Sequence, residues 1–162
     1  MGERRSRLGS RFKRAVEKAE DAREQGQRSA QEAERQARLA RAELFADLES
    51  LGKEIGVLTV QRTKQGLTLR YRERYLHFAP DGIGDVVVEF EGTGDDVHRL
   101  YREAELGDRW VHHCKRRFRD LRVPLFDQGI EDLLVDALGL PRPDDEPDPE
   151  PGPTDDGPPR RL

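Results

Sequence analysis

The amino-acid sequence predicts an α+β protein in three parts: a long N-terminal Ala-rich helix, a small antiparallel β-meander of four or more strands covered by helices, and a disordered acidic Pro-rich C-terminal tail. Three observations predict this class. Apolar or small residues recur every three or four positions over residues 11–55, whereas apolar and polar residues alternate over 57–91. Residues 141–162 hold eight of the ten prolines and seven acidic residues, a composition typical of disorder.

Composition narrows the class of protein further. Of the 162 residues, 38% are charged and 34% hydrophobic, whereas a globular domain has about 25% charged and about 45% apolar residues. We therefore expect part of the chain to lie outside any core. The single cysteine excludes a disulfide scaffold. No apolar run is long enough for a membrane span and no secretory signal is present, so we expect a cytoplasmic protein, and the excess of Arg over Lys favours a bacterial origin.

The first long element is a helix over 11–55 that Gly56 ends. Its apolar stripe consists of alanine at first and of larger residues later. These larger residues are Leu44, Leu48, Leu51 and Ile55. They carry enough apolar surface to dock on a folded domain. We therefore expect a basic flexible N-terminus at 1–10, a projecting helix or coiled coil at 11–43 and a compact α+β domain at 44–140.

The small residues of the projecting segment predict a surface for a partner helix. Their spacings of three and four are those of a coiled coil, and small side chains let a second helix approach closely. The expected partner-helix seam is Ala15, Ala19, Ala22, Ala30, Ala33, Ala37 and Ala40. The alternative is a solvated helix stabilised by ion pairs such as Glu34 with Arg38.

Four alternating segments with short connections predict the antiparallel meander. The expected strands are 57–62, 67–72, 75–78 and 86–91. Their apolar face would be formed by Leu58, Val60, Leu67, Leu69, Tyr71, Leu76, Phe78, Val86, Val88 and Phe90. Such a face needs a cover, which the Leu44–Ile55 stripe and a C-terminal helix can supply.

The segment 97–122 fits either a strand or a helix. A helix that begins at Arg109 would put four residues on one face: Trp110, Cys114, Phe118 and Leu121. A strand would put Trp110, His112, Cys114 and Phe118 on one side. Pro124 ends either element. A last helix is expected at 128–138 with Asp127 as its N-cap, and its buried stripe would be Ile130, Leu133, Leu134, Ala137 and Leu138.

One short run is strongly basic. This basic patch consists of Lys115, Arg116, Arg117, Arg119 and Arg122. On a helix it would present a face able to hold phosphates. The second face of the sheet would add basic and aromatic residues of the kind that bind single-stranded RNA: Arg62, Arg70, Arg72, Tyr75 and His77. Against this stand the net charge of −4 and Glu89 and Glu91, which can pair with those arginines.

Metal and catalytic chemistry are not predicted. His112, His113 and Cys114 are adjacent and are good zinc ligands, but adjacent histidines point in different directions and no four-ligand spacing is present. Cys114 is expected to be a buried apolar residue. The chain has no Gly-rich phosphate loop before a helix and no Gly-x-Ser-x-Gly motif. We therefore expect no catalytic residue, metal, cofactor or small-molecule ligand.

The two ends of the chain carry opposite charge. Residues 1–14 contain six Lys or Arg and one Glu, whereas 141–162 contain three Arg and seven acidic residues. We expect such ends to contact partners or each other. The features together favour a non-catalytic adaptor or assembly protein that binds itself or a protein partner through its N-terminal helix, with a nucleic-acid-binding regulator as the alternative. The sequence leaves the partner and the oligomeric state open.

Overall fold

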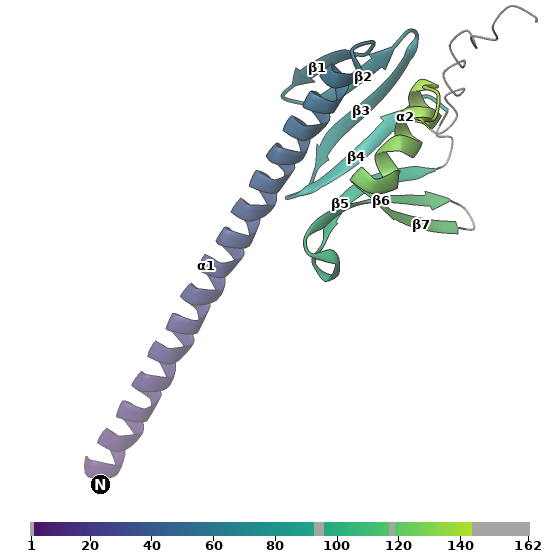
Figure 1. Cartoon of the computed structure of the whole chain (residues 1–162). Coiled ribbons are helices and arrows are strands. Elements are labelled where there is room, and N and C mark those ends of the chain that lie inside the picture. The colour runs from purple at the N-terminus through teal and green to yellow at the C-terminus, as the bar shows by residue number, and fades with distance from the viewer. Residues whose placement is uncertain (1, 93–95, 117–118, 144–162) are drawn as a thin grey trace, which may run out of the picture.

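The computed structural model describes residues 2–92, 96–116 and 119–143. This part of the chain has one very long helix, a seven-stranded antiparallel sheet and a short C-terminal helix (Figure 1). The helices are α1 (Gly2–Ile55) and α2 (Ile130–Leu138). The strands are β1 (Thr59–Thr63), β2 (Gly66–Tyr71), β3 (Arg74–Asp81), β4 (Asp85–Phe90), β5 (Val97–Glu103), β6 (Arg109–Arg116) and β7 (Arg119–Pro124). The expected α+β class and meander are confirmed, with seven strands in sequence order.

Helix α1 is longer than the apolar periodicity indicated. It begins at Gly2 rather than at residue 11, so it includes residues 2–10, for which a basic flexible N-terminus was expected. At 1.5 Å per residue its 54 residues extend about 80 Å. The helix ends at Ile55, and Gly56 follows with a φ of +78°, which is the left-handed conformation that glycine adopts at helix ends.

The core lies between one face of the sheet and the two helices. The last turns of α1 bury Leu44, Phe45 and Leu48, and α2 buries all five residues of its expected stripe. The sheet face predicted to be apolar is confirmed: its members are buried or pack partly buried against the core. Both helices therefore cover the same face and leave the opposite, outer face of the sheet without a helix among the described residues.

Helix α1 leaves the domain beside the β3–β4 turn. Its Arg41 guanidinium donates hydrogen bonds to the carbonyl oxygens of Asp81, Gly82 and Asp85 at 3.1–3.3 Å. One turn earlier, Ala37 packs so closely on Gly84 that a Cβ on this glycine would lie 2.9 Å from the Cβ of Ala37. These contacts define where the projecting part of α1 begins.

Residues 97–116 form a β-hairpin, so the helix that could have started at Arg109 does not form. A short 3-10 turn, η1 (Ala104–Leu106), leads into Gly107 and Asp108, and both have positive φ. This compact reversal brings β5 and β6 together in an antiparallel register over Val97–Glu103. β6 also pairs with β7, so it is an interior strand of the sheet. Phe118 lies outside the described residues.

The start of the last helix differs from the expectation. A single π-helical turn, η2 (Leu125–Gly129), precedes α2, and Gly129 rather than Asp127 occupies the N-cap. Asp127 is exposed and does not cap the helix, so the prediction that it is the N-cap is wrong. Gly129 instead permits close packing, because a Cβ there would lie 2.8 Å from the Cβ of His112 on β6. Gly139 ends α2 as expected, with its N–H bonded to the carbonyl oxygens of Leu134 and Val135.

The predicted tail falls mostly outside the described residues. At its start, Arg142 donates a hydrogen bond to the Asp132 carboxylate of α2 at 3.1 Å. Within the described residues, no helix combines the length and the apolar character needed to span a membrane.

Candidate functional site

The projecting part of α1 is one candidate functional surface. Every residue from Gly2 to Ala33 is exposed. Five of the predicted seam residues lie in this segment: Ala15, Ala19, Ala22, Ala30 and Ala33. Ala37 and Ala40 are half-buried instead, because α1 meets its own domain there. The structure thus leaves the first five available to a partner and uses Ala37 against the β3–β4 turn.

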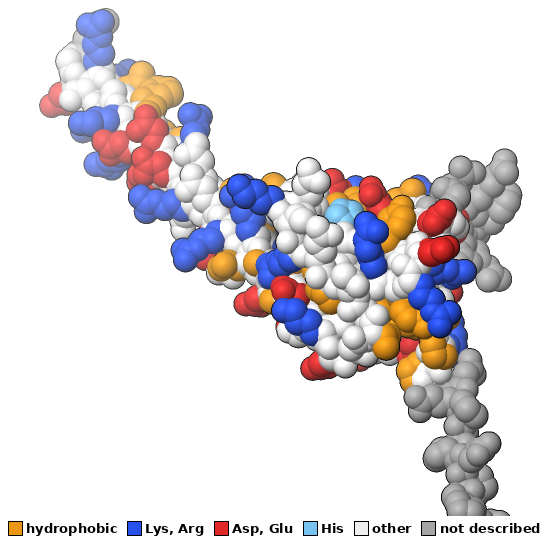
Figure 2. All heavy atoms as spheres, turned by 90° about the horizontal axis from the view of Figure 1, so that it is seen from above, with side chains coloured by type: hydrophobic (Ala, Val, Ile, Leu, Met, Phe, Trp, Pro, Cys, Tyr) orange, Lys and Arg blue, Asp and Glu red, His pale blue; other side chains and the backbone are white. Residues whose placement is uncertain are grey.

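Three larger apolar residues extend this surface to the free end of the helix. Leu8, Phe12 and Val16 are exposed by 53%, 64% and 53%. Figure 2 shows hydrophobic side chains near this end, with basic side chains around them. The predicted seam began at Ala15, although the apolar periodicity of the predicted helix already began at Phe12. Leu8 lies before the predicted helix start at residue 11, and its spacing of four from Phe12 identifies it once the helix is known to begin at Gly2.

The exposed apolar residues of α1 and the apolar residues of α1 that pack on the sheet form one continuous stripe along the helix. At about 100° per residue, Leu8, Phe12, the seam alanines, Leu44 and Leu48 stay within about 40° of a single line along the helix, whereas Val16 lies about 80° from that line, at its edge. The second half of this line packs on the sheet and the first half has no cover from the described residues. The exposed alanines are therefore the continuation of a packing face.

The basic patch is divided between two strands. Lys115 and Arg122 are exposed and lie on the outer face of the sheet, because their neighbours Cys114 and Leu121 pair with each other on the core side. Asp120 is the register partner of Lys115 and interrupts the positive charge. Arg116 and Arg119 are register partners on β6 and β7, and Arg117 lies outside the described residues. The strand geometry thus replaces the helical face considered above.

The outer face carries part of the expected basic and aromatic set. Arg70 and Tyr75 are register partners there, and so are His77 and Glu89. Arg62 was expected on this face, but it shares the side of Val60 and pairs with Glu49 of α1 at 3.1 Å. Arg72 lies in the β2–β3 turn, with a positive φ. The outer face thus carries a mixture of basic, aromatic and acidic side chains.

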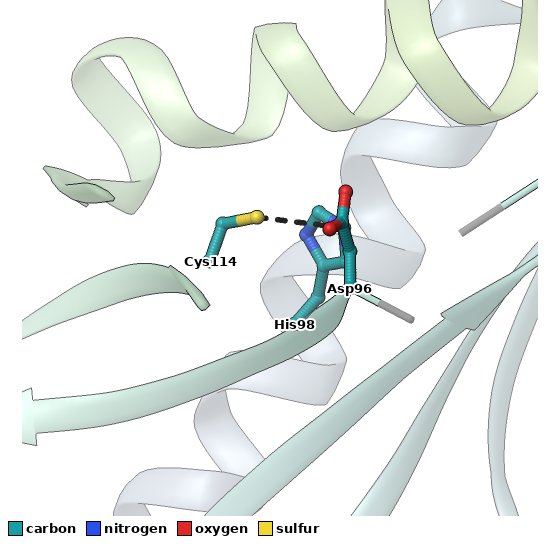
Figure 3. Close-up of side chains that lie close together, drawn as sticks. All are labelled: Asp96, His98 and Cys114. Atoms are coloured by element: carbon teal, nitrogen blue, oxygen red, sulfur yellow. Dashed lines mark hydrogen bonds between the residues drawn. The ribbon is translucent and has the colours of Figure 1, made fainter. Parts of the chain in front are cut away.

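A cluster of polar side chains lies on the core side of β5 and β6. His98 and Cys114 are register partners, and Asp96 directly precedes β5. The potential ligand atoms of these three residues lie within 4.8 Å of one another, and Figure 3 shows the three side chains pointing toward one another. The Cys114 Sγ lies 3.7 Å from Nε2 of His98. Cys114 is buried, as predicted, but it packs beside polar groups.

His112 supports this cluster from the same strand. Its Nε2 lies 2.9 Å from Nδ1 of His98, and the two rings stack with centroids 5.2 Å apart. Burial, and secondly the neighbouring His98, lowers the pKa of His112 to about 4. His112 is therefore neutral at pH 7. In this hydrogen bond one ring nitrogen donates its proton and the other accepts.

His113 lies apart from the cluster. Because successive residues of a strand point to opposite faces, His113 lies on the outer face, where its Nε2 is 3.4 Å from the Asp120 carboxylate. His112 and His113 thus point in different directions, as their adjacency in the sequence predicted. Sequence reasoning missed His98 and Asp96, because only the β5–β6 register brings them to Cys114. The alternation over 97–103 was the available signal.

A cavity of about 540 Å³ opens in front of the cluster. Asp96 and His98 line it together with Phe90 of β4, whose ring centroid lies 4.9 Å from that of His98. Its charged lining also includes Arg74, Glu91 and Asp136. Three carboxylates against one guanidinium give the cavity a negative balance, which favours cations over anions.

Comparisons with known proteins do not assign a function to either surface. No family model matches the chain, and no curated protein or solved structure is significantly similar to it.

Proposed function

We propose that the protein is a non-catalytic adaptor or assembly protein whose helix α1 binds a helix of a second copy or of another protein. The observation that carries this proposal is the exposure of every residue from Gly2 to Ala33. Helices gain most of their stability from packing of an apolar face, and this segment packs on no other described part of the chain. A cytoplasmic location and a bacterial origin stay predictions from composition.

The free end of α1 supplies most of the expected binding energy. Full burial of a Leu, Phe or Val side chain contributes about 1.5–3 kcal/mol, and Leu8, Phe12 and Val16 are at least half exposed. Alanine contributes less area but lets the helix axes approach. The exposed half of the stripe also continues the line on which Leu44 and Leu48 already pack against the sheet.

The proposal is tested by sedimentation velocity on the full chain over a wide concentration range. We expect the wild-type chain to self-associate and a Leu8→Glu/Phe12→Glu variant to stay monomeric. Leu39→Glu is the matched control, because Leu39 is 49% exposed and lies roughly 140° around the helix from Leu8. It should associate like the wild type.

Two results would contradict self-association. One is a wild-type chain that stays monomeric at the highest concentration. The other is equal association of the wild type and the Leu8→Glu/Phe12→Glu variant.

The second candidate is a nucleic-acid-binding regulator that uses the basic patch. The exposure of Lys115 and Arg122 on a sheet face without a helical cover favours it. Affinity for single-stranded RNA that falls steeply with salt would support this candidate. Helix pairing depends mainly on protein concentration, so the two functions are separable by experiment.

A further inference from the structure

Three side chains with different metal-binding atoms meet where β5 pairs with β6 (Figure 3). An imidazole, a thiol and a carboxylate lie within 4.8 Å of one another. These are the donor types that zinc takes from proteins. We propose that Asp96, His98 and Cys114 bind one Zn²⁺ ion at the inner end of the cavity beside β4 and β5. This site is independent of the partner helix proposed above.

The separation of the first two ligands already suits the metal. Zinc binds sulfur at about 2.3 Å and imidazole nitrogen at about 2.0 Å, so a tetrahedral site holds these two atoms about 3.6 Å apart. In the structure, Cys114 Sγ and His98 Nε2 are 3.7 Å apart. The cross-strand register, which pairs His98 with Cys114, sets this spacing. Asp96 directly precedes the strand and is half-buried, and its carboxylate lies within 4.8 Å of the other two ligand atoms.

The remaining nitrogen of His98 has the partner that a metal-bound imidazole needs. With zinc on Nε2, the ring carries its proton on Nδ1, and this N–H donates to Nε2 of His112 at 2.9 Å. Such a hydrogen bond fixes the tautomer and the ring orientation of a ligating histidine. His112 is therefore a positioning residue, and Gly129 permits the close packing of η2 against it.

The surroundings select the kind of ion. Mg²⁺ and Ca²⁺ prefer oxygen ligands, whereas thiolate and imidazole favour zinc. The negative lining of the cavity, from Asp96, Glu91 and Asp136 against Arg74, attracts a cation. Three protein ligands leave the fourth position facing the cavity, which holds room for water or a small ligand. This is the open type of zinc site rather than the closed structural type.

Spectroscopy with Co²⁺ tests the proposal on the full untagged chain after treatment with a chelator. We expect one equivalent of Co²⁺ to give a thiolate-to-metal charge-transfer band and the visible bands of tetrahedral Co²⁺. One equivalent of Zn²⁺ should displace the Co²⁺ and raise the thermal unfolding midpoint. If the wild-type chain shows no charge-transfer band, this measurement alone overturns the proposal, and no variant is needed.

Variants identify the ligands. Cys114→Ser should abolish the charge-transfer band, and Asp96→Asn should weaken Zn²⁺ binding about tenfold or more, an effect of the size that even outer-shell changes produce. His113→Gln is the matched control, because His113 lies on the opposite face of the same strand, and it should bind like the wild type. A charge-transfer band that persists in Cys114→Ser would disprove the site. So would a loss of Zn²⁺ affinity in His113→Gln as large as the loss in Asp96→Asn. Asp96 lies outside the strands, so Asp96→Asn gives the result even if Cys114→Ser does not fold.

Discussion

At Gly66, the absence of a side chain decides whether β2 can pair with β3. Gly66 has a φ of +132°, and a Cβ built there would lie 1.9 Å from the carbonyl oxygen of Phe78. The neighbouring atom belongs to the backbone of a central strand, so it cannot move aside cheaply. Glycine is therefore required here for both conformation and space.

We expect Gly66→Ala to lower the free energy of unfolding by about 3 kcal/mol or more, because backbone strain and a steric clash add. Urea unfolding followed by circular dichroism measures the loss. Gly82→Ala is the control: Gly82 also has a positive φ, of +55°, but no atom lies within 4 Å of the added Cβ. It should cost only about 1–2 kcal/mol. Equal losses in the two variants would refute the steric argument.

In the polar cluster, the position of a residue in the sequence does not show which side chains lie beside it in the fold. His112, His113 and Cys114 are adjacent, yet alternation along β6 sends His113 to the outer face and leaves the other two on the core side. His98 is 16 residues away from Cys114 and becomes its partner through the hairpin. The candidate metal ligands were therefore visible as residue types in the sequence, but not as a group.

At the scale of the element, α1 has two unlike halves. Leu8 and Phe12 lie at the basic free end, and small residues such as Ala30 and Ala33 lie nearer the domain. A parallel pair of helices would place two basic ends, residues 1–14, side by side. An antiparallel pair would place Leu8 opposite Ala33 and Phe12 opposite Ala30, and the basic end would lie along 27–40, a segment with three Arg and two Glu that is less basic than 1–14. Packing and charge both favour the antiparallel arrangement.

If the helices pair in this way, chains with Leu8→Cys should form disulfides with chains that carry Ala33→Cys. Mild oxidation of the mixture followed by non-reducing electrophoresis detects the mixed dimer. The wild-type chain is the control for background, since its own Cys114 is buried. A parallel pair in register would instead link each variant to itself, and this result would reject the antiparallel arrangement.

At the scale of the whole molecule, the fold combines a compact sheet domain with the long projecting part of helix α1. Arg41 and Ala37 fix the exit of α1 at the β3–β4 turn, and the helix continues past this point without a contact from the described part of the domain (Figure 1). Binding at the free end would thus hold a partner about 50 Å from the point of exit.

We expect small-angle X-ray scattering of the monomeric Leu8→Glu/Phe12→Glu variant to give a skewed pair-distance distribution. Its maximum dimension should be at least about 80 Å, the length of α1 alone. Its sedimentation coefficient should be lower than that of a compact protein of 18.6 kDa. A compact scattering profile would mean that α1 folds back on the domain, contrary to the structure.

The sequence by itself determined the elements whose pattern is local and long. Periods of 3.6 and 2 identify α1, the first four strands, the apolar sheet face and the buried stripe of α2, because each period follows from the backbone geometry of one element. The tertiary structure alone decided the rest. Residues 97–122 fit both periods. Their strand conformation was decided by the pairing of β5 with β4 and by the turn at Gly107 and Asp108. The same register joined Asp96 and His98 to Cys114, since contacts between distant residues depend on strand pairing, which local periodicity does not specify.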